Sequence, residues 1–289
     1  MSAKESPNHH RRELIMAATA IAVQPICALA QNNAEVKIGL TPVFLDSRSG
    51  FLQRWRTYLE RDLGQSVAFV QRRSYADIIE LLMNGQLSAA WLCGYPYVRY
   101  KSSLQLVAVP RYEGVPLYSA YIITGPSAKK IQQFAELRGK VFAYSDPLSN
   151  SGYLFAKDHL HRIGETDSHF FRKSFFAFGH QNVISAVSEG LADAGSVDGY
   201  VWDSLRRIKP DLTESTKILI KSEKFGFPPF VAPKGASSRI VLALRQSLFG
   251  MQNSSNGKEL LRDLNLDGFV PGSDQLFLNI EAMMKRVKV

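Results

Sequence analysis

Hydrophobic and polar residues along the first part of the chain switch repeatedly between the period of a strand and the period of a helix. Polar and apolar side chains alternate over 35–40 and predict a strand, and apolar side chains at helical spacing over 51–59 predict a helix. The switch repeats with strands at 66–70 and 87–92 and a helix at 75–83 between them. This β-α-β-α-β order indicates an α/β lobe with a mostly parallel sheet.

The same rhythm recurs in the middle of the chain, over 125–224. Two strands precede it, at 104–110 and 117–124, and the second is rich in residues that favour strands. Within it, the pattern predicts a short helix feeding a strand (134–144), a helix beginning near 152, a strand (174–178), a helix (181–189), a strand (192–198) and a helix (200–208). The recurrence indicates a second α/β lobe flanked by helices.

The last part of the chain offers too few elements to form a lobe of its own. After 225–231, the pattern predicts a helix at 237–248, a further element at 258–264 and a final helix at 276–287. We therefore expect these elements to return to the first lobe. The expected domains are a discontinuous first lobe, 34–120 plus 225–289, and a continuous second lobe, 121–224.

The first thirty residues differ from everything after them. Arg11 and Arg12 precede an apolar stretch at 14–23, and Ala28-Leu29-Ala30 then ends the segment with small residues. This is the pattern of a secretory signal, and the arginine pair also partly resembles a twin-arginine export signal. We expect 1–30 to be a signal peptide; the alternative is a buried N-terminal helix.

Composition indicates a soluble globular protein. The 289 residues are 45% hydrophobic and 21% charged, and no apolar run reaches about 20 residues. The formal net charge of +9 suits an anionic ligand or an anionic membrane face, and charge alone does not choose between them. Lysine and arginine are scattered and not interleaved with aromatic residues, which argues against a nucleic-acid partner.

The strongest local signal is the segment Asp146-Pro-Leu-Ser-Asn-Ser-Gly152, where a strand ends and a helix begins. Unpaired N–H groups at a helix N-terminus bind anions, and the hydroxyls of Ser149 and Ser151 add donors. Asn150 adds an amide, and Gly152 lets the backbone pass closely. We interpret this segment as an anion cradle; the alternative is a helix cap with no ligand.

Two further strand-to-helix junctions carry candidate ligand contacts. His180 follows Gly179 and can donate to an oxyanion, although a lone histidine is more often a satisfied partner at a loop end. Asp198 lies at the carboxyl end of a small-residue strand, where open α/β sheets bind ligands. A helix cap is an equal alternative for Asp198.

A fourth candidate lies in the first lobe. Gly94 and Pro96 predict an exposed turn that presents Cys93, Tyr95 and Tyr97. Tyrosine hydroxyls suit a pocket that is apolar on its walls and polar at one point.

The cysteines bear on the redox chemistry of an exported chain. Cys27 falls in the signal segment, which leaves Cys93 without a partner for an internal disulfide. Cys93 is then intermolecular, reactive or a small buried hydrophobe.

Motifs of common enzymes are missing from the sequence. It contains no Gly-x-Ser-x-Gly, His-Glu-x-x-His, Cys-x-x-Cys or phosphate-loop pattern. His159 and His161 are two residues apart on a predicted helix and cannot share a face, which argues against a metal site there. We expect no enzyme, no metal and no cofactor.

The order of these motifs resembles that of the phosphate/phosphite/phosphonate-binding periplasmic proteins of ABC importers, over nearly all of 35–289. The resemblance is carried by Asp-Pro-x-Ser-x-Ser-Gly, Gly-His, Ala-Asp-x-Gly-x-Val-Asp and Pro-Pro-Phe-Val. It implies a two-lobed periplasmic-binding-protein fold of type II with two crossover hinge strands, near 117–124 and 196–200. It also implies the anion contacts Ser149, Asn150, Ser151, His180 and Asp198, with Tyr95 and Tyr97 lining the pocket.

Cys93 departs from the importer pattern. The same fold includes proteins that sense arsenite through a pocket cysteine and signal to a membrane histidine kinase. We expect a monomeric periplasmic protein that closes its lobes on a small oxyanion (phosphonate, phosphite or phosphate-like) and delivers it to an ABC permease. The alternative is an oxyanion sensor that uses Cys93 and signals to such a kinase.

Overall fold

The computed structural model describes residues 1, 3, 35–41 and 49–289. Residues 35–41 and 49–289 belong to one compact unit, Asn33–Val289. The predicted signal segment lies outside the described residues, apart from positions 1 and 3. None of the helices in the described part is both long and apolar enough to cross a bilayer.

The sheet of the first lobe has the strand order β11-β4-β10-β3-β1-β2. The strands are β1 Val36–Leu40, β2 Val67–Gln71, β3 Ala89–Trp91, β4 Leu104–Arg111, β10 Phe230–Pro233 and β11 Gly268–Val270. β1 pairs in parallel with β2 and β3, whereas β10 runs antiparallel to β3 and β4, and β11 antiparallel to β4. The first sheet is therefore mixed, because β10 and β11, from the C-terminal part of the chain, add antiparallel pairs to the parallel ones.

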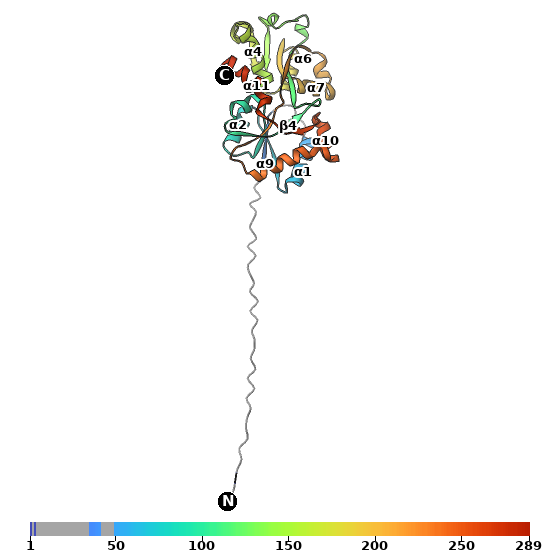
Figure 1. Ribbon diagram of the computed structural model, residues 1–289. Coiled ribbons are helices and arrows are strands. Elements are labelled where there is room, and N and C mark those ends of the chain that lie inside the picture. The colour runs from blue at the N-terminus through green and yellow to red at the C-terminus, as the bar shows by residue number, and fades with distance from the viewer. Residues whose placement is uncertain (2, 4–34, 42–48) are drawn as a thin grey trace. The chain divides into compact units, whose positions relative to one another are not determined.

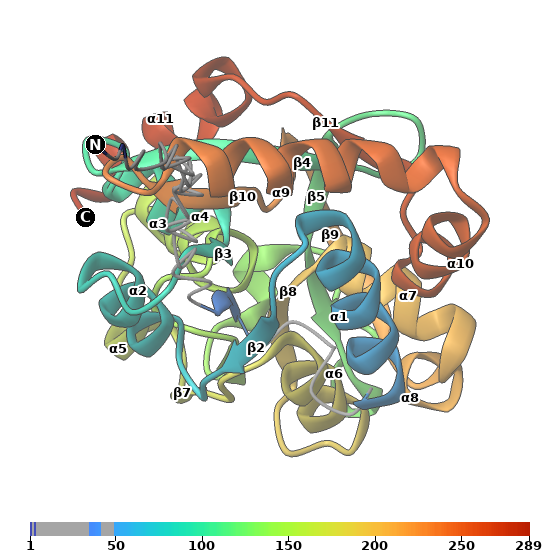
Figure 2. The same ribbon diagram turned by 90° about the horizontal axis from the view of Figure 1, so that it is seen from below.

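Helices from both ends of this unit flank the first sheet. They are α1 Ser49–Leu63, α2 Tyr75–Met83, α3 Gly94–Arg99, α9 Ser238–Gly250, α10 Ser255–Leu264 and α11 Leu278–Val287, with short 3₁₀ turns η4 Met251–Asn253 and η5 Asp274–Phe277. α1 and α9 pack against each other (Figure 2). In the sheet, α1 contacts β2 and α9 contacts β4. Trp55 of α1 is fully buried between Trp91, Phe230 and Phe69, which ties this helix to the core.

The second sheet has the order β7-β6-β8-β5-β9. Its strands are β5 Leu117–Thr124, β6 Val141–Tyr144, β7 Lys173–Phe176, β8 Ala194–Asp198 and β9 Lys217–Gly226. β6 is parallel to β7 and β8, and β5 is antiparallel to β8 and β9. The helices are η1 Pro126–Ala128, η2 Phe134–Leu137, η3 Asn150–Leu154, α4 Phe155–Arg162, α5 Asp167–Phe170, α6 His180–Ser188, α7 Gly199–Ile208 and α8 Asp211–Glu214.

The chain passes between the two sheets at two places. It leaves the first sheet between β4 and β5, over 112–116, and returns between β9 and β10, over 227–229. Figure 1 shows α4, α6 and α7 in one lobe and α1, α2, α9 and α10 in the other. The predicted two-lobed α/β fold is confirmed. The lobe limits at 120 and 225 stay predictions.

The expected second hinge at 196–200 is wrong. β8 lies in the middle of the second sheet, where it pairs with β5 and β6, so this segment does not cross between lobes. The return crossing follows β9, which the sequence pattern did not predict. Lysines and a glutamate on β9 keep it half-exposed and mask its strand period.

Side chains on opposite sides of the site join the two lobes. On one side, Arg286 of α11 donates from Nε to Oδ1 of Asp158 in α4 at 2.7 Å. On the other, Nδ2 of Asn265, which ends α10, donates to Oγ of Ser204 in α7 at 3.0 Å. The lobes are therefore in contact around the segments that carry the candidate site.

Candidate functional site

The cradle forms the junction between β6 and α4. Ser149 caps η3, one turn of π-helix that runs directly into α4, and its Oγ accepts the N–H of Gly152 at 3.0 Å. Such wide turns are rare and occur frequently at functional sites. For Ser149 the helix-cap alternative therefore applies, whereas Asn150 and Ser151 are fully buried without serving as caps.

Gly152 is the residue that lets the cradle fold over its neighbours. A Cβ at this position would lie 1.7 Å from Oγ of Ser145 and 3.0 Å from Cε1 of His180. Any side chain would therefore push the cradle away from these two residues. The glycine in the motif reflects close backbone approach, as the sequence predicted.

Three buried polar atoms in the cradle and directly before it have no hydrogen-bond partner among the described residues. They are Oγ of Ser145, Oδ1 of Asn150 and Oγ of Ser151. An unsatisfied buried polar group costs about 1–3 kcal/mol. Such groups occurring next to one another indicate a place where a polar ligand completes the hydrogen bonding.

His180, the first residue of α6, contacts both neighbouring segments. Its Nδ1 accepts the backbone N–H of Asp198 at 3.1 Å, and its Nε2 lies 3.3 Å from the hydroxyl of Tyr75 in the first lobe. Burial lowers the pKa of His180 to about 3, so the imidazole is neutral. The bond at Nδ1 places its single proton on Nε2.

Asp198 is both a helix cap and a buried acid beside His180. Its Oδ1 accepts the N–H groups of Tyr200 at 2.9 Å and Val201 at 3.4 Å, at the start of α7. Burial raises the pKa of Asp198 to about 8, against the opposing effect of these two bonds. At neutral pH the carboxyl is therefore mostly protonated and offers an O–H donor. The structure thus shows the helix-cap alternative for Asp198, and its contact with a ligand stays a prediction.

The predicted exposed turn at 94–96 is wrong. These residues begin the short helix α3, and Gly94 to Val98 are all buried. The cause is the C-terminal part of the chain: a Cβ on Gly94 would lie 2.6 Å from Ile280 and 3.2 Å from Phe277. Local residues gave no sign of this cover, because it comes from far along the sequence.

Cys93 nevertheless reaches the cradle. Its side chain is buried, and its Sγ accepts the backbone N–H of Asn150 from the opposite lobe at 3.2 Å. Burial raises the pKa of the thiol to about 11, so it is protonated at neutral pH. Of the three possibilities for this cysteine, the structure shows a buried thiol at the site.

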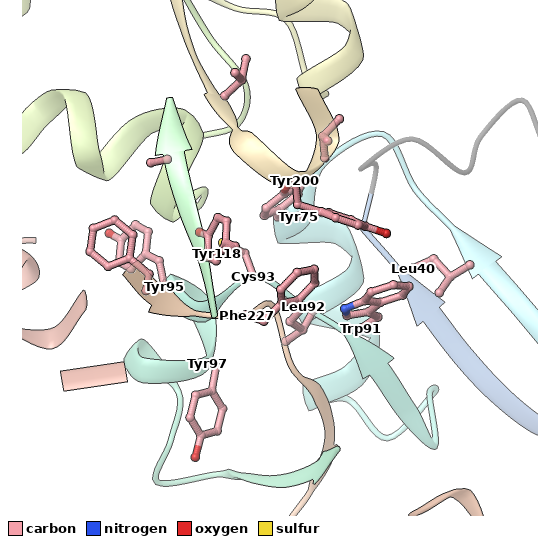
Figure 3. Packing of buried hydrophobic residues seen from close by; sticks show 14 of the residues in the cluster. Leu40, Tyr75, Trp91, Leu92, Cys93, Tyr95, Tyr97, Tyr118, Tyr200 and Phe227 are labelled. Atoms are coloured by element: carbon pink, nitrogen blue, oxygen red, sulfur yellow. The ribbon is translucent and has the colours of Figure 1, made fainter. Parts of the chain in front are cut away.

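The two predicted pocket tyrosines are directed elsewhere. The hydroxyl of Tyr97 donates to the carboxylate of Asp274, and its ring packs edge-on against Phe277. The hydroxyl of Tyr95 accepts a hydrogen bond from Arg99 of the same helix at 3.2 Å. Figure 3 shows Tyr97 pointing away from Tyr118 and Cys93. The structure does not bring these hydroxyls to the cradle.

Other side chains take their place beside the cradle. Tyr118 of β5 accepts a hydrogen bond from Nδ2 of Asn150 at 2.9 Å, and Tyr75 begins α2 beside His180. Asp146 accepts the backbone N–H of Tyr75 at 3.0 Å across the lobes. Sequence reasoning assigned both tyrosines to ordinary core elements. A polar Ser74 directly before Tyr75 was the available signal, since it marks Tyr75 as the first residue of a helix.

Among residues 35–41 and 49–289, no lysine or arginine is buried with these groups. In the described part of the chain, the buried polar and charged side chains are hydroxyls, one amide, one histidine and several acids. The donors that these described residues offer to an anion at the cradle are therefore neutral O–H and N–H groups. The same residues contain no group of three His, Cys, Asp or Glu side chains placed to hold a metal ion.

A buried cluster of polar groups supplied by two α/β lobes defines a two-lobed ligand-binding protein. Residues 38–277 match the family described as ABC transporter, phosphonate, periplasmic substrate-binding protein, and the chain belongs to this family. The match confirms the family that the motif order resembled.

Individual relatives are distant but cover most of the chain. The phosphate-import protein PhnD of Mycolicibacterium smegmatis is 25% identical over 75% of this chain and 67% of its own length. A probable ABC transporter phosphite-binding protein, PhnD1 of Prochlorococcus marinus, is 20% identical over 89% of this chain and 91% of its own. Both descriptions concern transport, and neither supports the sensing alternative.

Solved structures show the same fold. PhnD1 of Prochlorococcus marinus in complex with methylphosphonate has a TM-score of 0.77 at 17% identity, covering 89% of this chain and 99% of that one. A binding-protein component of an ABC phosphonate transporter from Pseudomonas aeruginosa has a TM-score of 0.80 at 19% identity, covering 88% and 86%.

Proposed function

We propose that this chain captures a small tetrahedral oxyanion of the phosphonate, phosphite or phosphate class between its lobes and delivers it to an ABC permease. The observation that carries the proposal is the group of unpartnered buried atoms on Ser145, Asn150 and Ser151. These atoms adjoin donors from both lobes, and a tetrahedral anion has enough oxygens to engage several of them at once.

The donors favour an anion that keeps a proton. No lysine or arginine is buried with the cradle in the described part of the chain, and Asp198 is a neutral acid at pH 7. A fully ionised ligand would meet a second negative charge once Asp198 loses its proton. A singly charged oxyanion avoids this repulsion and is the expected ligand form.

The family description supports a periplasmic, non-enzymatic role. We extend the proposal to a monomer that is exported by the signal at 1–30, with the twin-arginine route as the export path to test. Mass spectrometry of the protein recovered from the periplasm tests this signal directly. An intact N-terminus there would overturn it.

Isothermal titration tests the ligand class. We expect heat with at least one of methylphosphonate, phosphite and phosphate, and a loss of about 10- to 100-fold in affinity for Ser151→Ala, since a hydrogen bond to a charged group is worth roughly 1.5–3 kcal/mol. Ser238→Ala, an exposed serine at the start of α9, is the matched control and should bind like the parent. No heat with any of the three anions would contradict the proposal.

A further inference from the structure

One contact between the lobes lies between the buried site and the solvent. Arg73 directly precedes the cap of α2 in the first lobe, and its guanidinium carbon lies 5.5 Å from the centroid of the Phe178 ring in the second. This distance is within the range of a cation–π interaction. Arg73 is exposed and Phe178 is half-buried. Two residues further along each segment, Tyr75 and His180 are buried, so the Arg73–Phe178 pair is the solvent-facing neighbour of the buried site.

The turn that carries Phe178 has an unusual backbone conformation. Phe178 lies in the left-handed region at φ 51°, and Gly179 follows at φ 153°. A bulky side chain is rarely found at such a φ. Asn182, in the first turn of α6, holds the turn in place: its Nδ2 donates to the carbonyl oxygens of Ala177 at 2.9 Å and Phe178 at 3.5 Å.

This turn brings the Phe178 ring into contact with both lobes. In its own lobe the ring packs near Phe176 of β7, with centroids 6.3 Å apart. From the other lobe, the guanidinium of Arg73 lies over it. Strained backbone persists where its surroundings hold it, and it clusters at ligand clamps and switch segments. The strain at Phe178 therefore points to a contact that the lobes use when they close.

Arginine suits this contact better than other cations. Its guanidinium is planar and weakly hydrated, so it stacks on aromatic rings at a small desolvation cost. The neighbouring Arg72 does not take this place, because its Nη1 donates to the carbonyl oxygen of Gln71 in its own lobe at 2.8 Å. Of two adjacent arginines, Arg73 is thus the one that reaches the second lobe.

We propose that Arg73 and Phe178 form a clasp that holds the lobes together beside the bound ligand and slows its release without touching it. This inference rests on the proposed function. The two residues belong to different lobes, so the contact is made as the lobes close. A contact of this kind changes the dissociation rate more than the association rate.

A double-mutant cycle on the dissociation rate tests the clasp. The probe is whichever of methylphosphonate, phosphite and phosphate the parent binds most tightly. Its release is measured by stopped-flow competition at one ionic strength for the parent, Arg73→Gln, Phe178→Leu and the double variant. Each single variant should release the anion about 2- to 5-fold faster, the range that a cation–π contact at an exposed site allows. The double variant should be no faster, because both substitutions remove the same contact.

Two further variants separate the contact from charge and from side-chain size. Arg72→Gln removes the same charge one residue away and should release the anion at the parental rate. Any general loss of attraction for the anion then appears in the association rate of both glutamine variants. Phe178→Tyr keeps the aromatic face and should retain the slow release.

Several results would overturn the clasp. They are a parental release rate in Arg73→Gln, effects of the two substitutions that add, or an equal acceleration in Arg72→Gln, which would assign the effect to charge. If Phe178→Leu does not fold, as judged by thermal unfolding, Phe178→Met replaces it in the cycle.

A parent that binds none of the three anions would contradict the proposed function and leave the clasp to a second measurement. Small-angle X-ray scattering of the ligand-free proteins then decides it. A larger radius of gyration in Arg73→Gln than in the parent and Arg72→Gln would support the clasp. Equal radii in all three would overturn it.

Discussion

At the scale of single residues, burial decides the chemistry of the site. His180 is neutral, and Asp198 and Cys93 keep their protons at pH 7, because each would lose hydration on becoming charged. Among the residues that the structure describes, the site therefore presents hydrogen-bond donors without a buried positive charge. A buried group whose pKa is shifted on folding, such as the carboxyl of Asp198, makes binding and stability depend on pH.

Asp198→Asn tests this effect on stability. The folded-state pKa of Asp198 is about 8, above its ordinary 3.8, so its favourable contribution is fully present below about pH 4 and is lost as pH rises through 8. The asparagine variant lacks this loss and still caps α7. Its stability relative to the parent should rise between pH 4 and 8, by at most roughly 1.4 kcal/mol per pH unit.

Urea unfolding of the two ligand-free proteins at a series of pH values measures this difference. Asp211→Asn, which removes an exposed acid at the start of the short α8, is the matched control for the loss of a carboxylate. A flat difference for Asp198→Asn would show that its carboxyl titrates normally.

At the scale of elements, the cradle depends on a wide turn that only glycine can complete. Gly152→Ala places a Cβ 1.7 Å from Oγ of Ser145, and overpacking of this kind costs roughly 1–3 kcal/mol. We expect a loss of that size in the free energy of unfolding and weaker anion binding. Gly235→Ala, with open space around its Cβ, is the control in the same denaturant series. Equal stability of both variants would contradict the packing of the cradle.

Strand and helix periods were enough to predict most elements and the strand-to-helix junction at 146–152, because local residues determine them. The short helix at 94–99 was not predictable, since Phe277 and Ile280 cover it from the far end of the chain. Tyr75 and Tyr118 were hidden for a related reason. Each fits the apolar pattern of its own element. The pairing of the lobes brings the hydroxyl of Tyr75 to His180, and the packing of η3 on β5 within the second lobe brings that of Tyr118 to Asn150.

At the scale of the whole molecule, contacts between lobes add to the affinity for whatever the site holds. Asn265, in the left-handed conformation at φ 56°, ends α10 and bonds to Ser204 and Arg207 of α7. Asn265→Gly keeps the backbone conformation, which glycine adopts easily, and removes these bonds. Because they join the two lobes, their loss should favour the open state.

Calorimetric titration of Asn265→Gly should show an affinity about 3- to 10-fold lower, as expected for one or two bonds of roughly 0.5–1.5 kcal/mol. Lys288→Gly is the control. Lys288 is an exposed residue that also ends a helix in the left-handed backbone conformation, and this variant should bind like the parent. Unchanged affinity in Asn265→Gly would mean that these bonds do not contribute to the closed state.

The central claim is that a tetrahedral oxyanion sits in the cradle between the lobes. A crystal structure of the chain with methylphosphonate tests it most directly. We expect phosphonate oxygens within hydrogen-bond distance of Ser145 and Ser151, with Cys93 and Asn150 beside them. An anion bound elsewhere, with Ser145, Asn150 and Ser151 left unpartnered, would contradict it.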